Sequence, residues 1–102
     1  MDSEFDSKRV KLSRTEEERR PLIQRLGRIE GQVRGLRQMI EEDRYCLDEV
    51  QQAHAIIAAL REVTLMVVSS HLAAGFELAA DAPEREAILQ EMMSVLRAGL
   101  RQ

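Results

Sequence analysis

The stretch that decides the fold is Cys46–His71, CLDEVQQAHAIIAALREVTLMVVSSH, and its pattern predicts one long helix. Cys46 and His71, its two possible ligand residues, are 25 positions apart. That separation is close to seven turns of about 3.6 residues, so both side chains point to the same face. At about 1.5 Å per residue, however, they are about 37 Å apart along the helix. No ion or small molecule can touch both within one chain, so a shared site needs a second chain.

A seam of mostly small and apolar residues connects these two positions. Its members follow a 4-3 spacing along which two helices can pack: Cys46, Val50, Ala53, Ile57, Leu60, Thr64, Val67, His71 and Ala74. Pairing the helix antiparallel with its own copy about Ala58 places Cys46 of one chain opposite His71 of the other. This predicts a two-fold dimer with two identical Cys/His sites. The spacing alone leaves a second interpretation open, in which Cys46 is a small buried side chain and His71 is hydrogen-bonded at a helix end.

Length and composition favour a small helical protein. A chain of 102 residues buries a limited core, so oligomerisation is a natural route to stability. Aromatic residues are few, and residues that favour helices are abundant. The single cysteine, Cys46, excludes an intrachain disulfide. No apolar run approaches the length of a signal or membrane segment, which predicts a cytoplasmic protein without a membrane partner.

Periodicity divides the chain into a tail and three helices. Residues 1–13 are polar and aperiodic and are expected to form a flexible N-terminal tail. Residues 14–102 are expected to form a single helical domain, with helices at about 14–42, 46–79 and 83–101. The first helix can begin with either of two capping boxes, Ser13 with Glu16 or Thr15 with Glu18. Its apolar stripe, which includes Leu26, Ile29, Val33 and Ile40, is expected to pack against the second helix.

Charge is distributed unevenly along the chain. The net charge of −3 argues against a general polyanion binder. Yet residues 1–37 contain ten Lys and Arg against seven Asp and Glu, whereas residues 38–102 contain five against eleven. On the first helix, Arg14, Arg25 and Arg28 lie within about 60° of one another, an arrangement that can contact phosphates. A solvated helix face with local ion pairs is the alternative interpretation. No catalytic constellation is present, so the sequence does not predict an enzyme.

Three motifs resemble the family of small bacterial repressors that includes the copper-sensitive operon, nickel/cobalt and formaldehyde repressors (CsoR/RcnR/FrmR). They are Arg25–Val33 (RLGRIEGQV), Tyr45-Cys46 followed by Gln51-Gln52, and Ser70-His71-Leu72. The resemblance covers about residues 20–101. It implies an all-α, three-helix subunit, an antiparallel helical dimer and a dimer-of-dimers tetramer.

The resemblance also implies a function and a set of DNA-binding residues. Such proteins are transcriptional repressors that hold operator double-stranded DNA on the basic face of the first helix, without a recognition helix. By this match Arg25 and Arg28 are the first candidates for DNA contact, followed by Arg14 and Arg61. Binding of an effector lowers DNA affinity and releases transcription.

The same resemblance assigns the effector site. The cross-dimer cysteine and histidine fall on Cys46 and His71, with Tyr45 and Glu91 in the shell around them. Gly75 is a departure, because copper sensors have a cysteine and nickel/cobalt sensors a histidine at that position. No cofactor is obligatory, and two classes of effector remain open.

One class is a soft metal ion such as Cu(I), and the other is a formaldehyde-like electrophile. For the electrophile, Lys8, Lys11 or the terminal amine would supply a nitrogen beside Cys46. The net acidic charge supports a different function, a helical oligomer that does not bind DNA but buffers metal or scaffolds a partner.

Overall fold

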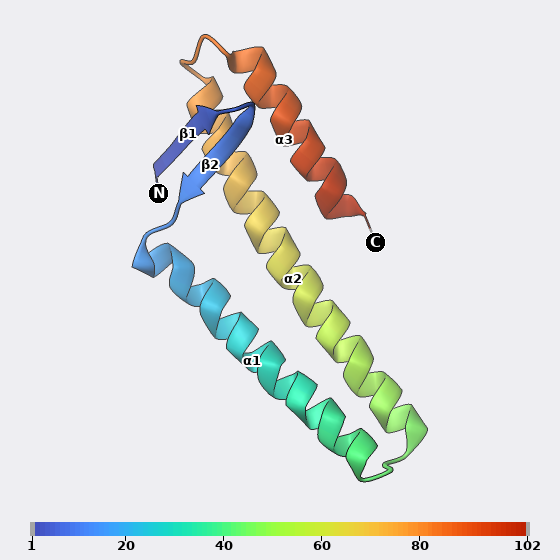
Figure 1. The fold of residues 1–102 in the computed structure, drawn as a ribbon. Coiled ribbons are helices and arrows are strands. Elements are labelled where there is room, and N and C mark those ends of the chain that lie inside the picture. Colours follow the sequence, from blue (N-terminus) through green and yellow to red (C-terminus); the bar gives the residue numbers. More distant parts are fainter. Residues whose placement is uncertain (1, 102) are drawn as a thin grey trace. The chain divides into compact units, whose positions relative to one another are not determined.

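The computed structural model describes residues 2–101, which form three helices and a two-stranded antiparallel sheet (Figure 1). The strands are β1 (Asp2–Asp6) and β2 (Arg9–Ser13), and the helices are α1 (Glu16–Glu41), α2 (Cys46–Ala79) and α3 (Arg85–Leu100). The three predicted helices are confirmed, with every boundary within two residues of its predicted position. The fold is mostly α rather than all-α.

The chain divides into two compact units. The first unit contains the segment that ends at Arg19 and the segment that begins at Thr64, and the second contains residues 20–63. Both α1 and α2 therefore contribute to both units. The prediction of one domain over residues 14–102 stays a prediction.

The expectation of a flexible tail over residues 1–13 is wrong for its described part, which forms a β-hairpin. The strands pair in a continuous register, with Phe5 opposite Val10 and Glu4 opposite Lys11. The two-residue turn places Ser7 and Lys8 at φ 53° and 64°, both in the left-handed region that a tight hairpin turn requires. Val10 and Leu12 alternate with polar neighbours, so one face of β2 is apolar.

The hairpin is held by the core of the first unit. This core consists of four buried side chains, Val10, Ala79, Ile88 and Met92, with Phe5, Leu12, Leu72, Leu78, Ala82 and Leu89 packed against them. β2, the end of α2 and α3 all contribute to it. Burying Val10 among distant helical residues gives the hairpin the apolar cover that an isolated two-stranded sheet lacks.

Replacing Ile88 with Val is expected to destabilise the protein by about 1 kcal/mol, because it removes one methyl group from a packed core. Ile88 is the most buried large side chain described, with 0% exposure. Ile23→Val makes the same chemical change at a residue that is 57% exposed, and we expect almost no effect there. Urea unfolding of both variants measures the difference. Equal destabilisation of the two would contradict this description of the core.

The second unit buries less apolar surface than its sequence pattern suggests. Ile29 of α1 and Ile56 of α2 are buried, and the Gln52 side-chain amide donates to the Gln32 carbonyl oxygen at 3.0 Å. The rest of the apolar stripe of α1, which was expected to pack against the second helix, is largely exposed to solvent. Its members Leu26, Val33 and Ile40 are all exposed. The expectation of a stripe buried against the second helix is therefore correct only at its centre.

α1 begins with the capping box formed by Thr15 and Glu18, which was one of the two predicted boxes. The Glu18 N–H donates to Thr15 Oγ1 at 3.2 Å, and the Thr15 N–H donates to Glu18 Oε1 at 3.1 Å. The second of these bonds stabilises the carboxylate and holds the pKa of Glu18 below its ordinary value. The cap therefore contributes its full stability above the ordinary pKa of a glutamate and loses it as the pH falls through the lowered value.

Glu18→Gln is expected to reduce slightly the loss of stability between neutral and acid pH. Glutamine keeps the capping geometry but has no charge to lose. The variant should therefore be slightly less stable than the original chain at neutral pH, where the original has a charged cap, and should approach it in stability as the pH falls through the lowered pKa of Glu18. Thermal unfolding at pH 7 and pH 3 measures this, with Glu17→Gln in the same turn as control. The same acid sensitivity in Glu18→Gln and the original chain would contradict it.

The apolar character of α2 corrects one sequence-based statement. By length and composition alone α2 could cross a membrane, with a mean hydropathy of 1.5 over its most apolar window. The statement that no apolar run approaches that length was therefore wrong. The finding is weak support for a membrane helix, since core helices of soluble proteins pass the same test. The expectation that the protein has no membrane partner stays a prediction.

Candidate functional site

His71 is fixed by a carboxylate from the neighbouring helix. Its Nε2 lies 2.9 Å from Glu91 Oε2 and 3.2 Å from Oε1. The two side chains are 14% and 15% exposed, so solvent screens the contact only partly. Within residues 2–101 no hydrogen-bond partner is found for Nδ1. A contact through Nε2 orients the ring and leaves Nδ1 as the nitrogen that can bind a ligand or a metal.

Cys46 is the first residue of α2 and carries a free, exposed thiol. The preceding residue, Tyr45, is also exposed, and its carbonyl oxygen accepts hydrogen bonds from the N–H groups of Asp48 and Glu49. Cys46 and Tyr45 belong to the second unit, whereas His71 and Glu91 belong to the first. The grouping of Cys46 with His71 across a dimer stays a prediction.

The predicted seam is largely uncovered within one chain. Its four large apolar members, Val50, Ile57, Leu60 and Val67, are all exposed. Ala74, at the end of the seam, is buried instead. Exposed aliphatic side chains at helical spacing are typical of a face that packs against another chain.

Two of the four predicted DNA-binding arginines lie together. Arg25 and Arg28 line a shallow pocket of about 190 Å³ with Ile29, Gln32 and Ala59. Within residues 2–101 neither arginine makes an ion pair. Other arginines do, since Arg19, Arg37 and Arg44 contact Glu16, Glu41 and Glu42. The alternative of a solvated face with local ion pairs therefore describes those residues better than Arg25 and Arg28.

The other two predicted arginines are placed differently. Arg14 precedes α1, and its carbonyl oxygen accepts a hydrogen bond from the Arg19 guanidinium at 3.0 Å. It belongs to the first unit. Arg61 is exposed on α2 in the second unit, and neither residue lines the pocket with Arg25 and Arg28. Their contact with DNA stays a prediction.

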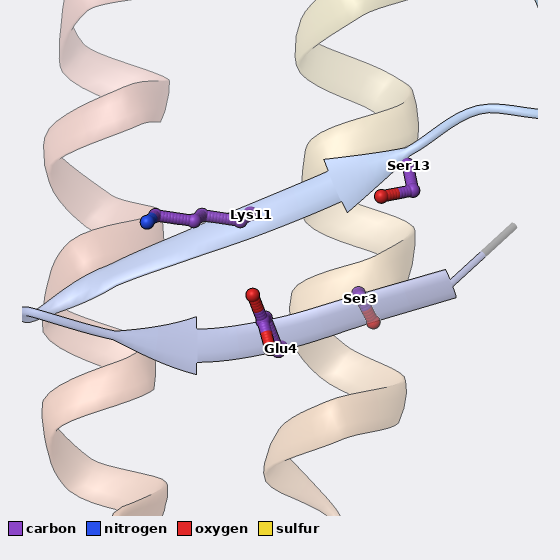
Figure 2. Close-up of a pocket in the computed structure, with 4 residues that line it drawn as sticks. All are labelled: Ser3, Glu4, Lys11 and Ser13. Carbon is purple, nitrogen blue, oxygen red and sulfur yellow. The ribbon is translucent and has the colours of Figure 1, made fainter.

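The two lysines proposed as amine donors lie on the hairpin. Lys8 is in its turn, and Lys11 Nζ contacts Asp6 Oδ2 at 3.3 Å. Lys11 also lines a pocket of about 200 Å³ with Ser3, Glu4 and Ser13, and Figure 2 shows these side chains along the two strands. Glu4 lies opposite Lys11 in the register, so the charges of this pocket largely compensate each other.

Met92 of α3 packs against α2 one helical turn after His71, and it was not among the residues predicted for the site. A Cβ atom added to Gly75 would lie 2.5 Å from Met92 Sδ. Gly75 is one helical turn after His71, so the thioether packs against the same part of α2. The signal in the sequence was a glycine inside a helix, which usually indicates close approach by a neighbour.

The chemistry of these groups is that of a binding protein. Within residues 2–101 no three His, Cys, Asp or Glu side chains form a group that could hold a metal ion. The described part of the chain offers a His–carboxylate pair, an exposed thiol and unpaired arginines on a separate helix face. These features define a small helical protein with two candidate ligand side chains, Cys46 and His71, on one long helix.

Comparison with known proteins identifies the family. The family model for metal-sensitive transcriptional repressors matches residues 18–98. The copper-sensing transcriptional repressor CsoR of Bacillus subtilis is 34% identical over 84 residues, which cover 82% of this chain and 83% of that protein. The copper-sensing repressor RicR of Mycobacterium tuberculosis is 54% identical over 48 residues, which cover 47% of this chain and only half of that protein's length.

Two solved structures have the same fold. The copper-sensing repressor CsoR with Cu(I) from Geobacillus thermodenitrificans has a TM-score of 0.78 and 37% identity, covering 89% of this chain and 95% of that one. The nickel-responsive transcriptional regulator InrS has a TM-score of 0.76 and 30% identity, covering 87% and 100%. This chain belongs to the metal-sensitive transcriptional repressor family. That family is not enzymatic, in agreement with the sequence analysis.

Proposed function

We propose that this protein represses transcription by binding operator DNA and is released when an effector engages Cys46 of one subunit and His71 of its partner. The observation that carries the proposal is the His71–Glu91 pair at 2.9 Å, which orients one ring nitrogen and leaves the other available. The exposed thiol of Cys46 on the same helix supplies the second ligand.

An antiparallel dimer of α2 is the proposed way to unite these groups. The uncovered apolar residues between Cys46 and His71 support it, because burying four large aliphatic side chains against a second copy is favourable. A tetramer made of two such dimers follows from the family resemblance. We place the protein in the cytoplasm, where its thiol stays reduced and its operator is accessible.

The proposed DNA-binding surface is centred on Arg25 and Arg28. Both guanidinium groups are exposed, lie on the same face of α1 and make no ion pair within residues 2–101. Guanidinium groups bind phosphate oxygens through paired donors, so this face can contact the DNA backbone without entering a groove. Arg14 and Arg61 are proposed to extend this contact.

A soft metal ion, and Cu(I) above all, is the effector that we favour. A thiolate and an imidazole are ligands that Cu(I) accepts, and two relatives are described as copper-sensing. The metal would be bound by Cys46, by His71 and by a further donor, with Glu91 and Tyr45 around them. A formaldehyde-like electrophile is the second candidate. Lys8 and Lys11, whose amines could react with it, lie in the hairpin of the first unit, and His71 belongs to the same unit.

A single titration tests the function and separates the effectors. Reduced protein is bound to a labelled DNA fragment from upstream of its own gene, and Cu(I), Ni(II) and formaldehyde are added in turn while fluorescence anisotropy is followed. We expect release by Cu(I) that a Cu(I) chelator reverses. Release by formaldehyde alone, with a covalent mass change at Cys46, would replace the metal with the electrophile.

The same titration tests the non-DNA alternative. A chain that binds Cu(I) but shows no specific affinity for its upstream DNA at physiological salt is a metal-buffering oligomer, and the repressor proposal fails. The salt concentration must be fixed in this comparison, because non-specific binding to DNA is strongly salt-dependent.

A further inference from the structure

The contact between Gly75 and Met92 places a sulfur atom against α2, one helical turn after His71. A Cβ at residue 75 would lie 2.5 Å from Met92 Sδ and 2.7 Å from its Cγ. Both distances are shorter than real side chains permit, so Met92 can adopt this position only because residue 75 is glycine. The sulfur thus occupies the space that a side chain of residue 75 would fill.

That space adjoins the histidine of the proposed effector site. Residues four apart on a helix are neighbours on one face, with Cβ atoms about 5–6 Å apart, so a side chain at position 75 would be next to that of His71. From α3, Glu91 contacts His71 and the adjacent Met92 contacts Gly75. Two consecutive residues of α3 therefore meet two consecutive turns of α2.

Packing alone explains the burial of Met92 but not the glycine. Met92 is 3% exposed and belongs to the core with Val10, Ala79 and Ile88. A branched aliphatic side chain would fill such a core without requiring an adjacent glycine. Glycine in the interior of a helix costs about 1 kcal/mol relative to alanine, and what it makes possible here is the approach of a thioether to the surroundings of His71.

We propose that Met92 Sδ is a third ligand of the effector site, which makes the site selective for Cu(I). This proposal rests on the proposed function, in which the other two ligands are His71 of the same subunit and Cys46 of the partner subunit. A thiolate, an imidazole and a thioether form a soft donor set, which suits Cu(I) and is poor for a hard cation. Within residues 2–101 no group of three His, Cys, Asp or Glu competes for the ion.

Met92→Leu tests the proposal with little change of volume, since exchanges between leucine and methionine are usually tolerated in cores. Cu(I) affinity is measured by competition with a chromophoric Cu(I) chelator. We expect a loss on the order of tenfold or more, the scale on which supporting residues of metal sites act. Ni(II) affinity should not change. Met93→Leu is the matched control, because Met93 is adjacent in sequence but exposed.

A spectroscopic measurement gives a readout that packing cannot mimic. In protein that carries selenomethionine, X-ray absorption at the selenium edge should show a selenium–copper distance when Cu(I) is bound. This signal should persist in Met93→Leu and vanish in Met92→Leu. Gly75→Ala retains the sulfur but displaces it, and should weaken Cu(I) binding without a change in helix content.

Two results would overturn the proposal, and they have different meanings. Full Cu(I) affinity in Met92→Leu, with no selenium–copper distance in the labelled protein, makes Met92 a packing residue and leaves the proposed function intact. If Cys46→Ala binds Cu(I) as tightly as the original chain, the cross-dimer site itself is wrong, and the role of Met92 falls with it.

Discussion

Cys46→Ala is expected to bind operator DNA as the original chain does and to lose its release by the effector completely. Cys46 is exposed at the start of α2 and contributes nothing to either core, so its removal should leave the fold and the DNA-binding surface unchanged. The coupling between two sites on such a protein typically changes affinity by about 5–150-fold. In the variant that change should be absent, because in the proposed site the Cys46 thiolate is the ligand that one subunit contributes beside His71 of its partner.

His54→Ala is the matched control for this prediction. His54 lies on the same helix, is exposed and is eight residues from Cys46, which places it about 80° away around the helix. DNA affinity is measured by anisotropy for each variant, with and without saturating Cu(I). Release that persists in Cys46→Ala, or that is lost equally in His54→Ala, would contradict the assigned site.

The double variant Arg25→Ala with Arg28→Ala is expected to lower operator affinity by at least about a hundredfold at physiological salt. Each guanidinium is expected to form a charge-assisted contact to phosphate, worth about 1.5–3 kcal/mol. Loss of these contacts should also make the dependence of affinity on salt shallower, by about one unit of slope for each phosphate contact removed. Cu(I) binding should not change, because these residues are not part of the proposed effector site.

Arg37→Ala controls for the loss of positive charge. Arg37 is exposed on α1 like the other two, but its Nε contacts Glu41 Oε1 at 3.6 Å. We expect it to affect DNA binding only weakly. If the DNA affinity of the double variant and its salt dependence are unchanged, α1 does not carry the DNA-binding surface. That result would favour the helical oligomer that does not bind DNA.

The helices could be predicted from sequence because their information is local. Apolar spacing predicts the ends of α1 and α2 to within two residues, and the Thr15–Glu18 box was one of two candidates for the first cap. Periodicity does not say what covers an apolar stripe. Leu26 and Val33 were assigned to an internal contact, yet both are exposed in the chain.

The hairpin was missed because its turn lacks the usual signal. Two-residue hairpin turns favour glycine or asparagine, whereas here Ser7 and Lys8 adopt positive φ values. The alternation of Val10 and Leu12 with polar residues was visible, but it spans only five positions. What stabilises it is a core that includes Ile88 and Met92, far along the chain. A short strand that depends on distant residues cannot be recognised from its own pattern.

The candidate site was only partly accessible to the same reasoning. Helical spacing could place Cys46 and His71 on one face, but it carried no information about the partner of His71. Glu91 was named through family resemblance, and the structure places its carboxylate 2.9 Å from the ring. Neither spacing nor resemblance could predict a role for Met92 in the site, because its position depends on how α3 packs against Gly75.

The register of the hairpin limits how its length can change. Asp6 pairs with Arg9 and Phe5 with Val10, and the apolar face of β2 is defined by alternate positions. Inserting or deleting one residue within β2 would turn Lys11 toward the core and Val10 toward solvent. The polar face of this segment can accept substitutions, whereas a change of one residue in length cannot be absorbed. The hairpin is therefore constrained in its number of residues more than in their identity.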